Sequence, residues 1–85
     1  MAVTVPDWLT KHGGELRPGA GGRTWMVLLG GEPLYVLAAV PAEGHESCKV
    51  TQANNGNRLD SGATYLTLDD AARGGLEDLR KALGW

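Results

Sequence analysis

The most nucleophilic side chain in this sequence, a thiol, stands three residues after a histidine. Cys48 is the one cysteine of the 85-residue chain, and His45 precedes it. A thiol beside an imidazole is the arrangement of a cysteine nucleophile with its general base. In an extended strand, however, an odd spacing places two side chains on opposite faces. Free cysteine is also among the most buried residue types, so we interpret Cys48 as a core thiol and assign no catalytic residue here.

The sequence offers no complete set of ligands for a metal or a nucleotide. A zinc site needs about four ligands, and the chain has one cysteine and two histidines, with His12 far from His45. The glycine-rich residues 19–23 lack the Gly-Lys-Ser/Thr ending of a phosphate-binding loop and the third glycine of a dinucleotide fingerprint. We therefore predict no metal, no cofactor and no identifiable small-molecule substrate.

Residues 59–64 read Leu-Asp-Ser-Gly-Ala-Thr. This string resembles the catalytic loop of retropepsin-type aspartic proteases, in which Asp-Ser-Gly-Ala or Asp-Thr-Gly-Ala follows an apolar strand. The resemblance implies a hydrolase in which Asp60 and its counterpart in a dimer share a proton and activate water. The preceding residues 55–58 are polar, and a capped helix follows downstream. We therefore reject the protease resemblance and interpret the string as a strand end with a turn, which leaves an aspartic-type hydrolase through Asp60 as the third functional alternative.

Composition indicates one small globular domain spanning residues 1–85. Hydrophobic residues make up 42% and charged residues 21%, far from the signature of disorder. The formal net charge of −2 argues against broad binding to phosphate backbones. No stretch has the length and apolarity of a membrane span, and no signal peptide is recognisable, so we expect a cytoplasmic protein with no membrane contact.

Thirteen glycines, mostly clustered between apolar runs, predict many tight turns and short strands. Pro6 to His12 suits a short helix, and Gly13 ends it. The expected strands are residues 15–17, 23–29, 33–40 and 46–52, with a short further strand at 58–61 after an Asn-Gly turn.

The clearest element is a helix that begins after Thr67. A capping sequence, Thr67-Leu68-Asp69-Asp70, is followed by an apolar stripe at helical spacing: Leu68, Ala72, Leu76, Leu79 and Leu83. The pair Gly74-Gly75 indicates either close packing or a kink. The expected fold class is α+β: an antiparallel three- to four-stranded sheet, a short N-terminal helix, and a C-terminal helix packed on one face.

The last third of the chain carries a resemblance to a small family. Residues 53–65, with their Asn-Asn-Gly turn, Ser61 and Tyr65, followed by the Thr67-led helix, are similar to the YegP-like ββα family. An extra residue in the turn and the N-terminal extension depart from that pattern. The resemblance implies a ββα unit and the pairing of such units, and it implies no chemistry.

The first two main strands carry apolar residues on both faces, which is typical of strands covered on both sides. We expect Met26, Leu28, Tyr35, Leu37 and Ala39 to form a patch on the face away from the C-terminal helix, with the short N-terminal helix hiding part of it. A patch of that kind predicts a non-enzymatic interaction or assembly domain that associates with itself as a homodimer.

An alternative use of the sheet is nucleic-acid binding. Four basic residues lie on or next to the expected strands: Arg17, Arg23, Lys49 and Arg58. A sheet backed by a helix can place its open face against nucleic acid. The net charge of −2 argues against this alternative.

Overall fold

A computed structural model of the chain describes residues 5–85, which form a five-stranded antiparallel sheet with two α-helices. Residues 1–4 of the predicted domain lie outside the described part. The strands lie in the sheet in chain order: β1 (Gly14–Pro18), β2 (Thr24–Leu29), β3 (Glu32–Ala42), β4 (His45–Gln52) and β5 (Thr64–Tyr65). Helix α1 (Asp7–Lys11) precedes them, α2 (Leu68–Leu83) follows them, and a 3₁₀ turn, η1 (Ala20–Gly22), joins β1 to β2. The predicted α+β class is confirmed.

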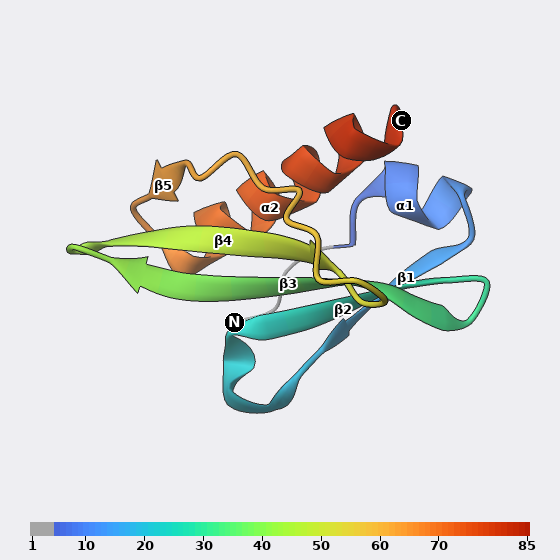
Figure 1. The fold of residues 1–85 in the computed structure, drawn as a ribbon, viewed down its shortest axis with the longest axis horizontal. Helices are drawn as coiled ribbons and strands as arrows, with labels where there is room; N and C mark the ends of the chain where they lie inside the picture. Colours follow the sequence, from blue (N-terminus) through green and yellow to red (C-terminus); the bar gives the residue numbers. More distant parts are fainter. Residues whose placement is uncertain (1–4) are drawn as a thin grey trace.

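Both α1 and α2 lie on the same side of the sheet (Figure 1). Leu9 of α1 is fully buried in the same core cluster as Leu79 of α2. The expectation that the N-terminal helix covers the second face is therefore wrong, because α1 packs beside α2. Within residues 5–85, the other face of the sheet carries no helix, and we call it the open face.

The register of β2 against β3 decides which side chains face the helices. Trp25 lies opposite Leu37 and Val27 opposite Tyr35, and all four side chains belong to the buried core. Ala39 is buried with them. The expectation that Tyr35, Leu37 and Ala39 face away from α2 is wrong. Their side chains lie on the helix side of the sheet, in the same buried core as residues of α2.

A β-bulge between Val27 and Leu28 is the physical reason. Next to the hairpin turn Leu28 lies opposite Pro33, and a regular continuation would pair Val27 with Leu34. Instead Val27 lies opposite Tyr35, which inserts one extra residue in β3. A shift by one residue moves every later side chain to the other face.

The expected patch is consequently much reduced. Leu28, whose cross-strand neighbours are Glu15 and Pro33, is only 4% exposed. Met26 is 40% exposed and remains on the open face. Met26 is thus the one member of the predicted patch that stays accessible to a partner.

The prediction of a short strand at 58–61 is also wrong. Arg58 forms a single bridge with Thr51, and the paired strand β5 comes later, at Thr64–Tyr65. The side chain of Asp60 accepts a hydrogen bond from the backbone N–H of Val50 at 3.0 Å. A carboxylate therefore takes the place of a strand carbonyl, and backbone pairing with β4 is interrupted there.

Helix α2 has the ends that the sequence predicts. The hydroxyl of Thr67 accepts a hydrogen bond from the N–H of Asp70 at 3.1 Å, and Gly84 closes the helix in the left-handed conformation. The glycine pair inside α2 is a site of close packing. A side chain at Gly75 would collide with Sγ of Cys48, and one at Gly74 with the ring of Tyr65.

Leu79→Ala should lower the free energy of unfolding by about 2–5 kcal/mol, because a buried leucine truncation loses transfer energy and leaves a cavity. Leu79 is fully buried, whereas Leu66 is 79% exposed. Leu66→Ala is the matched control and should change stability by less than about 0.5 kcal/mol in urea melts. Equal effects of the two variants would show that α2 does not anchor the core.

Candidate functional site

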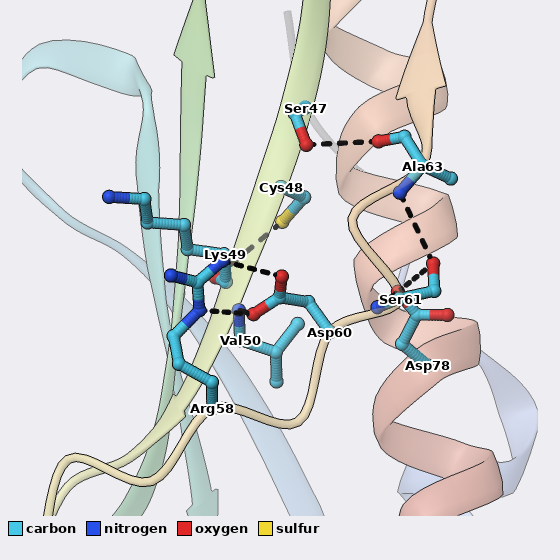
Figure 2. Close-up of polar contacts among 9 residues, drawn as sticks. All are labelled: Ser47, Cys48, Lys49, Val50, Arg58, Asp60, Ser61, Ala63 and Asp78. Atoms are coloured by element: carbon cyan, nitrogen blue, oxygen red, sulfur yellow. Dashed lines mark hydrogen bonds and ion pairs between the residues drawn. The ribbon is translucent and has the colours of Figure 1, made fainter.

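The most developed polar cluster centres on the carboxylate of Asp60, between β4 and α2 (Figure 2). One carboxylate oxygen accepts from Nε of Arg58 at 2.7 Å and from the N–H of Val50 at 3.0 Å. The second accepts from the terminal guanidinium nitrogen of Arg58 at 2.7 Å. The Asp60 side chain is only 3% exposed, while that of Arg58 is 54% exposed. The guanidinium therefore covers a carboxylate that faces the interior.

This geometry fixes the ionisation of Asp60. The hydrogen bonds from Arg58 lower the pKa of Asp60 to about 2, against the opposing effect of burial, and the N–H of Val50 lowers it further. A carboxylate that shares a proton with a partner, as in the aspartic-protease resemblance, needs one raised pKa. Asp60 has the opposite shift and is held in a bidentate ion pair, which differs from that arrangement.

The residues after Asp60 tie the loop to α2 and β4. The carboxylate of Asp78 accepts from both the N–H and the hydroxyl of Ser61, at 2.9 and 3.0 Å. The hydroxyl of Ser47 donates to the carbonyl of Ala63 at 2.9 Å. Figure 2 shows the loop running between the strand and the helix. These contacts close the core at the β4 side of the sheet.

Cys48 lies in the core and His45 outside it. The thiol is 3% exposed, and burial together with the negative charge of Asp60 raises its pKa to about 11. His45 is exposed and lies three residues earlier in β4, on the opposite face. The interpretation of Cys48 as a core thiol is confirmed in its placement, and the pair does not come together as nucleophile and base.

The four basic residues proposed for nucleic acid do not form one patch. Arg17 pairs with Glu15, Arg23 with Glu46, and Arg58 with Asp60. Lys49 is exposed on the open face, as is Arg17, and these two residues stand on different strands, β4 and β1. Three of the four charges are thus neutralised locally by carboxylates.

The open face combines a small apolar centre with polar and charged neighbours. Cross-strand pairing aligns Arg17, Met26, Val36 and Thr51 in one row across β1 to β4. The face also holds Ala38, Val40, Ser47 and Lys49. In the described residues it carries no aromatic side chain, so it has no platform on which bases could stack. Sequence reasoning placed Tyr35, Leu37 and Ala39 on this face, and the bulge puts Val36, Ala38 and Val40 there instead.

A hollow between α1 and α2 opens on the helix side of the molecule. It measures about 330 Å³ and is lined by Pro6, Trp8, Arg73, Leu76 and Glu77. Beside it the His12 ring stacks on Trp85 with a centroid distance of 3.8 Å, and Trp8 meets Trp85 edge-on at 6.0 Å. Sequence reasoning missed this cluster, because only the fold brings the two ends of the described chain together.

No protein-family model, curated protein or solved structure matches this chain. Among residues 5–85, no three His, Cys, Asp or Glu side chains gather where they could hold a metal ion. No helix of the described part has both the length and the apolarity needed to cross a bilayer.

Asp60→Asn should lower the free energy of unfolding by roughly 1–2 kcal/mol at pH 7, because one pKa unit corresponds to about 1.4 kcal/mol and the solvent around Arg58 weakens the pair. The pKa of Asp60 is depressed in the folded protein, so its contribution is complete above the ordinary value of 3.8 and is lost as the pH falls toward about 2. The difference between wild type and variant in urea melts should therefore shrink over that range.

The matched control is Glu15→Gln, which removes an exposed Arg17–Glu15 pair of the same two-residue spacing. It should change stability by less than about 0.5 kcal/mol. An Asp60→Asn penalty that is as large at pH 2 as at pH 7 would contradict the ionic origin of the effect.

Proposed function

We propose that this chain is a non-enzymatic interaction domain that associates with a second copy of itself through its β-sheet. The observation that carries the proposal is the one-sided construction of the described part. Among residues 5–85, the helices α1 and α2 both pack on one face, and no helix or strand covers the open face or the outer edge of β1. Unpaired strand edges and partly apolar faces are the surfaces through which sheets associate.

The chemistry of the interior supports a role without catalysis. Catalytic acids and bases need pKa values moved toward neutrality, and cysteine nucleophiles need a lowered pKa. The pKa of Asp60 is lowered to about 2, and the pKa of Cys48 is raised to about 11. Both groups are therefore moved away from reactive protonation states. This is the arrangement expected of groups that hold a scaffold together.

The open face supports a protein partner over a nucleic acid. Its centre, around Met26 and Val36, is apolar, and its border holds Arg17 and Lys49. An apolar centre with a polar rim is the general anatomy of a protein interface. A nucleic-acid surface instead needs an excess of unpaired positive charge, and three of the four candidate cations already pair with carboxylates.

The test is the solution mass, measured by light scattering after gel filtration across roughly 10 µM to 1 mM protein, a range that reports weak dimers. The expected result is a rise from the 9.0 kDa protomer toward twice that mass. A mass of one protomer throughout would contradict the proposal. A salt-dependent shift of nucleic acid in a gel would favour the nucleic-acid alternative instead.

A further inference from the structure

The open face by itself offers little apolar surface for a stable contact. Met26 is 40% exposed, whereas Val36, Ala38 and Val40 are half-buried between their neighbours. Antiparallel sheets commonly leave one face of this kind in solvent. The outer edge of β1 differs, because its backbone hydrogen-bonding groups have no strand partner among residues 5–85. Directional bonds are available there that the face cannot supply.

The pairing of β1 with β2 shows which backbone groups are free. The N–H of Gly19 donates to the carbonyl of Thr24 at 2.8 Å. Because backbone groups alternate along a strand, the odd-numbered residues of β1 face β2 and the even-numbered ones face outward. The outer edge therefore presents the N–H and carbonyl groups of Gly14 and Leu16 and the carbonyl of Pro18. Proline has no N–H, so Pro18 leaves no unpaired donor at its outward position and only its carbonyl is free.

The charges on β1 are self-complementary about Leu16. Glu15 and Arg17 flank it, both are exposed, and both lie on the open face. In a two-fold antiparallel pair centred on Leu16, Glu15 lies opposite Arg17 of the second copy, and Arg17 lies opposite its Glu15. Sliding the strands by two residues in either direction places like charges opposite one another, which is destabilising. The charges therefore select one register.

We infer that two copies of this chain join by antiparallel pairing of β1 with β1 of the second copy, centred on Leu16. The backbone of Leu16 bonds that of its counterpart in both directions, and the N–H of Gly14 donates to the carbonyl of Pro18 across the pair. The missing N–H of Pro18 keeps the ladder short, so the dimer is weak and reversible. The inference rests on the proposed self-association and specifies its contact.

The experiment is a charge exchange measured by sedimentation equilibrium. Glu15→Arg alone places two arginines opposite one another at each cross-strand pair, and Arg17→Glu alone places two glutamates there. Each variant should raise the dimer dissociation constant by about tenfold, because two attractive cross-strand pairs become repulsive. An equimolar mixture of the two variants should restore dimers, because each strand of the mixed pair then meets its opposite charge. Val36→Lys tests the open face separately, and Lys81→Glu, an exposed charge reversal on α2, is the control that should leave the dissociation constant unchanged.

The outcomes separate this inference from the proposed function. Dimers that survive both β1 variants but are lost in Val36→Lys would overturn edge pairing while keeping self-association through the face. A wild-type protein that stays monomeric over the whole concentration range would overturn both. Weakening by the single variants without recovery in the mixture would overturn the register centred on Leu16. Urea melts of each variant show whether the substitution leaves the fold intact.

Discussion

The β-bulge between Val27 and Leu28 sets the register of β2 against β3, and the rest of the architecture depends on that register. It turns Tyr35 and Leu37 toward the helices, where they meet Trp25 and the other core residues. The same shift turns Val36, Ala38 and Val40 to the open face. Side chains alternate between the two faces of a strand, so each residue of β3 after the bulge must lie on one face or the other. The bulge therefore determines which side chains of β3 enter the core and which lie on the open face.

Close packing of α2 and an ion pair between a buried carboxylate and an exposed guanidinium then complete that core. Gly75 allows the helix to approach until its backbone lies against Cys48, and Gly74 does the same for Tyr65. At the adjoining edge of β4, the carboxylate of Asp60 substitutes for a strand carbonyl and is neutralised by Arg58. The close approach of α2 and the Asp60–Arg58 pair together allow a short chain to bury its core on one side of the sheet. They also explain the shifted pKa values, because Cys48 is buried under α2 and Asp60 accepts hydrogen bonds from Arg58 and Val50.

The sequence was sufficient to predict the helices and strands that are specified by residues close together in the chain. The helix from Leu68 to Leu83 follows from its apolar period and from its ends, where Thr67 caps the first turn and Gly84 closes the last. The strands follow from alternation, with boundaries correct to within one or two residues at most ends. The face assignment could not follow, because Pro33, which directly precedes the extra residue of β3, fits the first position of a strand as well as a bulge. The loss of the strand at 58–61 likewise depends on Asp60 reaching Val50, a contact that exists only after folding.

Thiol accessibility at two adjacent alanines reports which face of the sheet each residue of β3 occupies after the bulge. Ala38 and Ala39 undergo the same substitution, Ala38→Cys or Ala39→Cys, each in a Cys48→Ala background. The bulge places Ala38 on the open face and Ala39, 5% exposed, beneath α2. The native protein should therefore react with a thiol reagent at least about tenfold faster at position 38 than at position 39, because burial blocks access and raises the thiol pKa. Faster labelling at position 39 would show that the register is the regular one and would contradict the account.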